Sequence, residues 1–149
     1  MTLDNLLATG QLLRQPADKT AIQKLLAAAT RNLADAALAG LSADNRFDAA
    51  YKTIMQCAMV GLWACGYRTA TSKPGHHQTA IQCLPKTMGL PQHTVIVLDA
   101  LRKQRNMNDY GGDPIADGAL DTCLQQAAAL LAHTQAWLAE HYPELSENP

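Results

Sequence analysis

The stretch ALRKQRNMNDYGGDP, residues 100–114, places charged side chains where an apolar helix face is expected to continue. The face reaches Leu101, and helical spacing assigns its next positions to Arg105 and Asn108. An arginine has a planar guanidinium that can contact two oxygens of a carboxylate or of a phosphate at once. The segment therefore predicts either an ion pair that closes the end of a helix or a phosphate-binding site.

Helical spacing also determines which side chains of this segment act together. Arg102, Arg105 and Asp109 stand at i, i+3 and i+7 and share one face, and Asn106 and Tyr110 form the neighbouring strip. A guanidinium, an amide, a carboxylate and a phenol at the end of one helix can bind and position a phosphate ester. The structural alternative is a salt bridge between Arg105 and Asp109, with the other cations of the segment solvated.

A second cluster of polar groups lies in GYRTATSKPGHH, residues 66–77. Arg68 and Lys73 fall in a predicted loop, and His76 and His77 stand at the start of a short helix. A histidine at a helix N-terminus has a lowered tendency to be protonated, which suits a base or a neutral hydrogen-bond donor. Adjacent helical residues point about 100° apart, so the pair cannot easily share a metal ion and no metal site is expected. The alternative is a capping and packing role for both histidines.

The composition limits the fold class and the partners. A chain of 149 residues is most simply one domain. Hydrophobic residues make up 48% of it, with much alanine and only 5% aromatic residues, which favours helices over strands. A net charge of −1 and a pI near 6.5 argue against nucleic-acid binding by bulk electrostatics, so any such contact must be local.

Cysteine usage and the N-terminal residues indicate the compartment. The four cysteines contain no C-x-x-C pair and fall mostly on apolar helical positions, so we expect buried free thiols. The opening MTLDNLLATGQ lacks the basic and apolar regions of a signal peptide. No stretch approaches the ~20 apolar residues of a membrane span. These features predict a cytoplasmic protein without a membrane partner.

Apolar periodicity, capping residues and glycines divide the chain, 1–149, into the helices and turns of a single helical domain. Asp18 and either Ser42 or Asp44 are candidate N-caps, and Asp113 with Pro114 is expected to open the last helix. No segment indicates a sheet. The predicted fold class is all-α, an antiparallel four-helix bundle with additional short helices. Helices are expected at about 3–14, 19–39, 43–65, 77–84, 91–110 and 114–142, with 143–149 as a short C-terminal tail.

Common catalytic and cofactor motifs do not occur in the sequence. It has no G-x-x-x-x-G-K-[ST], G-x-G-x-x-G, G-x-S-x-G or H-E-x-x-H pattern. This weakens hydrolase and nucleotide-kinase interpretations, and we expect no cofactor. No helix-turn-helix signature and no interleaving of aromatic and basic residues indicates a general DNA or RNA reader.

Three segments, taken with their order and spacing, resemble the HEPN superfamily, the higher-eukaryote and prokaryote nucleotide-binding domains. They are RFDAAYKTIMQCAMVGLWACGYR, GHHQTAIQCL and LRKQRNMNDY, and the resemblance extends from about residue 18 to residue 142. It implies an antiparallel helical bundle that commonly forms a homodimer and brings an R-x(4–6)-H motif from each protomer to a shared cleft. Active members are metal-independent endoribonucleases of toxin–antitoxin or phage-defence type, many of them paired with an antitoxin.

On this resemblance Arg105 and Asn106 occupy the start of the motif, and Arg105 would stabilise the phosphate. The position five residues after Arg105, where many active members have histidine, is Tyr110. An unperturbed phenol has a pKa of about 10 and is a poor base at neutral pH. Three interpretations follow. His76 or His77 supplies the imidazole, Tyr110 positions RNA without proton transfer, or the domain only binds its ligand.

The leading hypothesis is therefore a protein that acts on RNA as an endoribonuclease, and the alternative is a non-catalytic module that binds a nucleotide, RNA or a partner protein. A third interpretation is a helical scaffold in which Arg105 and Asp109 close the end of the bundle. The candidate catalytic residues are Arg105, Asn106, Asp109 and Tyr110. The candidate substrate-binding residues are Arg102, Lys103, Arg68, His76 and His77.

Overall fold

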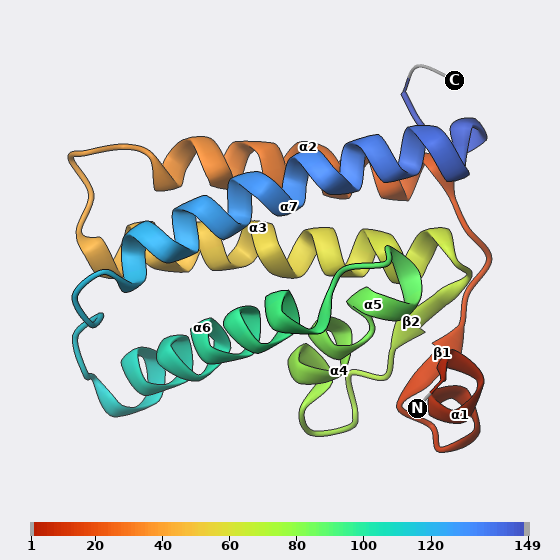
Figure 1. The fold of residues 1–149 in the computed structure, drawn as a ribbon, viewed down its shortest axis with the longest axis horizontal. Helices are drawn as coiled ribbons and strands as arrows, with labels where there is room; N and C mark the ends of the chain where they lie inside the picture. Colours follow the sequence, from red (N-terminus) through yellow and green to blue (C-terminus); the bar gives the residue numbers. More distant parts are fainter. Residues whose placement is uncertain (1, 148–149) are drawn as a thin grey trace.

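A computed structural model describes residues 2–147, most of which are helical, so the all-α class is confirmed in its coarse form. Figure 1 shows the order of the elements along the chain. None of the helices within residues 2–147 combines the length and the apolar character that crossing a membrane requires. The elements are α1 (Leu3–Ala8), β1 (Leu12–Arg14), α2 (Lys19–Ala36), α3 (Ala43–Ala64), β2 (Tyr67–Thr69), α4 (His76–Gln82), α5 (Leu84–Thr87), α6 (Gln92–Gly111), α7 (Ala119–His141) and the 3-10 turn η1 (Pro143–Leu145).

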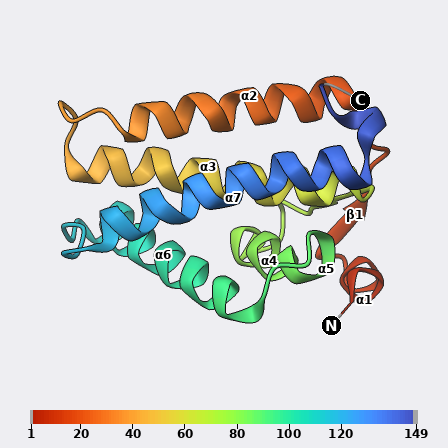
Figure 2. The same cartoon turned by 45° about the horizontal axis from the view of Figure 1, so that its top comes forward.

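Helix α3 lies at the centre of the molecule. It packs most extensively against α2 and α7 and also contacts α4, α5 and α6. Figure 1 and Figure 2 both show α2 and α6 on opposite sides of α3. Ser42 begins α3 by accepting a hydrogen bond from the Asn45 backbone N–H. Along its length Phe47, Tyr51 and Ile54 are almost completely buried, so this helix supplies much of the core.

The predicted start or end of several helices is confirmed by the capping geometry. The Asp18 carboxylate accepts from the Thr20 N–H at the start of α2, although this helix ends at Ala36, before the predicted residue 39. Helix α6 ends where Gly112 adopts a left-handed conformation (φ 71°) and its N–H donates to the Asn108 carbonyl. The short helix predicted at 77–84 is divided into α4 and α5, with Pro85 in the first turn of α5.

The prediction of a helix over 3–14 and of no sheet is wrong. Helix α1 ends at Ala8, and Gly10 takes a left-handed conformation (φ 79°) that turns the chain. Residues 12–14 then form an antiparallel two-stranded sheet with residues 67–69, in which Leu12 faces Thr69. Leu12 is completely buried, so the strand pairing satisfies the backbone of a segment whose side chain joins the core.

The last long helix begins at Ala119 rather than at Pro114. Asp113 is not its N-cap, because the Asp113 backbone helps to close α6 instead. The Asp113 N–H donates to the Met107 carbonyl, and its own carbonyl accepts from the Asn108 side chain. Residues 113–118 are therefore a connection, and α7 starts after Gly118, whose φ is 79°.

The segment predicted as a short tail over 143–149 is attached to the core in its described part. Leu145 is buried, and the Gln23 side chain donates to its carbonyl oxygen at 2.8 Å. Residues 148–149 of the predicted tail lie outside the described residues.

The cysteines are free thiols, as expected. Cys57, Cys83 and Cys123 are buried, and burial raises the pKa of their thiols to about 12, about 11 and about 12. Cys65 is half-buried and accepts a hydrogen bond from the Tyr142 hydroxyl at 3.7 Å. These thiols stay protonated at neutral pH and act as small apolar side chains.

Candidate functional site

Three helices bring a histidine and an arginine to the same tyrosine. Tyr51 of α3 is 1% exposed, and its hydroxyl lies 3.3 Å from Nδ1 of His77 at the start of α4. Cζ of Arg105, in the C-terminal half of α6, lies 5.4 Å from the centroid of the Tyr51 ring. We call Tyr51 together with His77, Arg105 and Arg102 the Tyr51 cluster. Its members come from distant parts of the sequence, so only the packing of α3, α4 and α6 assembles it.

Arg105 lies close to two carboxylates, but its Nε–H donates a hydrogen bond to neither of them. Its Nε lies 2.8 Å from Oδ2 of Asp109 on the same helix and 3.9 Å from Oδ1 of Asp48 on α3. The Nε–H does not point at either carboxylate, so the close approach is a charge contact rather than a directional hydrogen bond. Within residues 2–147 Nε is buried without a hydrogen-bond partner and the side chain is 23% exposed, so the terminal N–H groups of the guanidinium are the part that can reach the oxygens of a ligand.

Arg102 differs from Arg105 because its guanidinium is already hydrogen-bonded. Its Nε donates to Oδ1 of Asp99 at 2.8 Å, and Lys103 contributes a second cation at 3.5 Å from Oδ2 of the same carboxylate. Burial alone raises the pKa of Asp99, but the hydrogen bond and the charge of Arg102, with the charge of Lys103, outweigh it and lower that pKa. Asp99 is therefore ionised at neutral pH, and Arg102 is held in place on α6.

Electrostatics in the cluster fix the protonation of both aromatic partners. Burial, then the neighbouring His76 and the charges of Arg105 and Arg102, lower the pKa of His77, so its imidazole is neutral at pH 7. Burial raises the pKa of Tyr51 to about 12 against the opposing charges of the two arginines, so the phenol keeps its proton. A neutral imidazole beside two guanidinium groups is available for proton transfer.

The direction of the hydrogen bond between Tyr51 and His77 determines what the imidazole can do. If the Tyr51 hydroxyl donates to Nδ1, then Nε2 of His77 carries the ring proton and acts as a donor. If Nδ1–H donates to the Tyr51 oxygen, Nε2 has a free lone pair and can act as a base. Both tautomers are compatible with the 3.3 Å separation of the two atoms.

The lowered pKa of His77 has a measurable effect on stability. As the pH falls from about 7.5 to about 5.5, the unfolded chain binds a proton at this histidine before the folded chain does, so its contribution to stability declines. We expect His77→Gln to lose less stability than the wild type over this interval, as measured by urea unfolding at each pH. His93→Gln, at an exposed position of α6, should follow the wild-type curve. Parallel curves for wild type and His77→Gln would contradict this prediction.

Besides Asp109, the candidate residue that adjoins the cluster directly is His76. Its ring packs edge-on against that of His77, with the centroids 4.8 Å apart. Asn106 is half-buried on α6. Tyr110 is 82% exposed at the end of the same helix. The Tyr110 phenol is therefore in solvent, whereas the Tyr51 ring is buried.

The predicted basic patch is only partly assembled. Arg102, Lys103 and Arg105 follow one another along α6. Arg68 is half-buried in β2, paired in register with Leu13, and Lys73 lies beside Gly10 in the N-terminal region. No ion pair or hydrogen bond of the described chain links these last two cations to the Tyr51 cluster.

The sequence patterns missed Tyr51, Asp48 and Asp99. Tyr51 falls on the apolar face of α3, and this position predicts a core residue, which is correct for its ring but says nothing of its hydroxyl. A buried tyrosine hydroxyl generally needs a polar partner. A tyrosine on an apolar helix face therefore indicates a polar group next to the core. Asp48 is three positions before Tyr51 on α3, and its role depends on the approach of α6.

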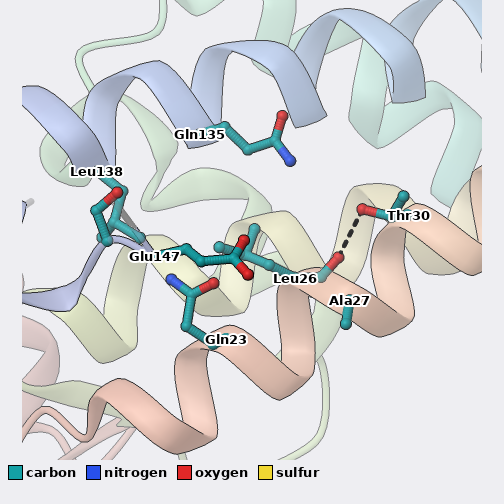
Figure 3. A pocket seen from close by; sticks show the side chains of 8 residues that line it. Gln23, Leu26, Ala27, Thr30, Gln135, Leu138 and Glu147 are labelled. Atoms are coloured by element: carbon teal, nitrogen blue, oxygen red, sulfur yellow. Dashed lines mark hydrogen bonds between the residues drawn. The ribbon is translucent and has the colours of Figure 1, made fainter. Parts of the chain in front are cut away.

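A hollow of about 330 Å³ lies between α2 and α7, away from the Tyr51 cluster. Figure 3 shows its lining, in which Gln23 and Thr30 come from α2, Gln135 from α7 and Glu147 from the C-terminal segment. The side chains that line it include no histidine and no cation. This hollow therefore lacks the groups that bind or cleave a phosphate ester.

Comparison of the chain with family models, with curated proteins and with solved structures gives no match. Within residues 2–147, no three histidine, cysteine, aspartate or glutamate side chains gather in an arrangement that could hold a metal ion. The function must therefore be argued from the geometry of the Tyr51 cluster.

Proposed function

We propose that this chain is a HEPN-like protein, an antiparallel four-helix bundle with additional short helices, that acts on RNA as a metal-independent endoribonuclease of toxin–antitoxin or phage-defence type. One observation supports it above the others. His77 and Arg105 meet at Tyr51, with the hydroxyl 3.3 Å from Nδ1 and the guanidinium carbon 5.4 Å from the ring centroid. The imidazole and the guanidinium that metal-free cleavage of RNA requires are thus neighbours, although Tyr110 replaces the histidine of the motif.

In this proposal the two groups have separate tasks. Arg105 binds the scissile phosphate with its fork and stabilises the charge that develops on the phosphate oxygens. His77, in the tautomer that donates Nδ1–H to Tyr51, accepts the proton of the ribose 2′-hydroxyl at Nε2. The 2′-oxygen then attacks phosphorus, and the 5′-oxygen leaves with a proton from solvent. The products are a 2′,3′-cyclic phosphate and a 5′-hydroxyl end.

The neighbouring residues support these tasks. Asp109 and Asp48 flank Arg105 and hold its guanidinium near them by charge attraction, and Asn106 is assigned to holding the geometry of the same helix end. Arg102 and Lys103 extend the positive charge along α6 toward the rest of the strand. Because Arg102 is bound to Asp99, its contribution is the field it adds rather than a free fork.

We also propose a homodimer and an antitoxin partner. The C-terminal half of α6, which carries Arg105, exposes two large side chains, Met107 at 52% and Tyr110 at 82%. Contiguous exposed apolar patches are typical of protein interfaces, and in this proposal the two side chains form part of one. A second protomer or an antitoxin bound there would cover the approach to Arg105.

The second candidate function is a non-catalytic module that binds a nucleotide, RNA or a partner protein. The observation that favours it is the neutralisation of the arginines. Asp99 binds Arg102 and Asp109 lies against Arg105, each at 2.8 Å, which weakens the positive field that a transition state would need. In such a module His77 presents Nε2–H as a neutral donor to its ligand.

The two functions are distinguished by incubating a mixed cellular RNA pool with the purified protein in EDTA. We expect cleavage by the wild type and a loss of about 100-fold or more in rate for His77→Gln, since general-base assistance contributes on that scale. His93→Gln, an exposed histidine of α6, is the matched control and should cleave normally. Cleavage by His77→Gln at the wild-type rate would contradict the assignment of the base.

A further inference from the structure

A groove of about 730 Å³ lies along the side of α6, opposite α4 and α5. Its floor includes Val95 and Ile96, and Ile96 is 63% exposed, an unusual degree for a large apolar side chain. Lys86 of α5 and Lys103 of α6 line it as well. The groove therefore combines an apolar surface with two cations, which is the complement of a base attached to a phosphate.

The charge of the groove favours an anionic ligand. Lys86 makes no ion pair within the described residues, and Lys103 is 68% exposed with its ammonium 3.5 Å from Asp99. Asp99 also lines the groove, but its carboxylate is hydrogen-bonded to Arg102. The cations around the groove thus outnumber its one carboxylate. Two amide side chains, Gln82 and Gln92, add both donors and acceptors to the lining.

The groove and the Tyr51 cluster are linked through Asp99. Asp99 belongs to its lining and binds Arg102, whose charge acts on both Tyr51 and His77. On the opposite wall, α4 has His77 at its first turn and Gln82 at its last residue. A strand whose phosphate lies at Arg105 and His77 can therefore continue into the groove.

We propose that this groove binds the nucleotide next to the scissile phosphate of a single-stranded RNA. The base lies on Ile96 and Val95, the amides of Gln82 and Gln92 hydrogen-bond its edge, and the next phosphate lies near Lys86. The inference rests on the proposed function, because it takes the strand bound at Arg105 as the ligand.

The test measures binding separately from cleavage. A fluorescent single-stranded oligoribonucleotide with 2′-O-methyl groups cannot undergo attack by the 2′-hydroxyl, so its anisotropy reports affinity alone. We expect Ile96→Asp to weaken binding about tenfold, through loss of the apolar floor and repulsion of the strand by the new carboxylate. Lys86→Gln should lower the slope of log affinity against log salt by about 0.7, since one phosphate contact is lost. Lys24→Gln, an exposed lysine of α2, is the matched control and should bind as the wild type does.

Failure of this proposal is distinct from failure of the proposed function. Binding by Lys86→Gln and Ile96→Asp equal to that of Lys24→Gln would overturn the groove, whatever the wild type does to unmodified RNA. Absence of wild-type binding to the oligonucleotide would also overturn it. An acidic protein segment as the true occupant would appear as normal RNA binding by both groove variants. The proposed function is tested separately, by the cleavage assay in EDTA that compares the wild type with His77→Gln.

Discussion

Replacing Arg105 with alanine is expected to lower the rate of metal-free RNA cleavage by about 100- to 1,000-fold and to leave the protein folded. The loss follows from removing the group that stabilises charge on the phosphate, for which single donors have effects of this size. The folding cost is small, because the carboxylates that face Arg105 are partly exposed, Asp109 at 32% and Asp48 at 35%. Water can solvate both when the guanidinium is absent, so we expect a loss of about 1 kcal/mol in unfolding free energy.

The measurement is the single-turnover cleavage rate in EDTA together with urea unfolding of the same preparations. Arg31→Ala, at an exposed position of α2, is the matched control and should change neither quantity. Arg105→Lys tests the fork directly, since lysine keeps the charge but not the two parallel donors. The scaffold interpretation gives the opposite pattern for Arg105→Ala, a loss of about 3 kcal/mol in stability from orphaned buried carboxylates. Such a loss, or an unchanged cleavage rate, would contradict our assignment of Arg105.

Phe47→Ala is expected to have the largest effect on folding, a loss of about 3–5 kcal/mol in unfolding free energy. Phe47 is 1% exposed on α3, and its carbonyl accepts a weak hydrogen bond from the Cys123 thiol of α7 at 3.9 Å. Truncation leaves a cavity where the two helices meet, and packed neighbours relax only partly into it. The loss is measured from urea unfolding curves of the two proteins.

A control for this prediction exists in the same chain. Leu38, in the connection after α2, is 54% exposed, and its truncation to alanine should change stability by no more than about 0.5 kcal/mol. Equal losses for Phe47→Ala and Leu38→Ala would show that the packing of α3 against α7 differs from that described. A loss confined to Phe47→Ala supports α3 as the central helix of the core.

The helices that the sequence predicted well have both an apolar stripe and local capping groups. Asp18 and Ser42 begin α2 and α3, and Gly112 ends α6, because capping depends on residues only a few positions apart. The strand at 12–14 could not be predicted in this way. Its partner lies at 67–69, and such pairing has no local periodic signal in a segment of three residues.

In the candidate site, too, a contact within one helix could be predicted from the sequence, and a contact between helices could not. The contact of Arg105 with Asp109 follows from a spacing of four residues on one helix, and the structure contains it at 2.8 Å. The approach of His77 to Tyr51 depends on how α4 packs against α3, which no spacing within either helix encodes. The resemblance to the HEPN motif offered Tyr110 at the position of its histidine and left His76 or His77 as an alternative source of the imidazole, and the imidazole that meets Arg105 at Tyr51 is that of His77.

We propose that His77 and Arg105 cleave RNA together without a metal ion. The most direct test is analysis of the ends formed when wild-type protein is incubated in EDTA with an RNA of defined sequence and with the same RNA bearing 2′-deoxyribose at the cleaved position. We expect 2′,3′-cyclic phosphate and 5′-hydroxyl ends from the first RNA and no cleavage at the substituted position of the second. Intact RNA from a folded wild-type protein, or cleavage at the deoxyribose position, would contradict it.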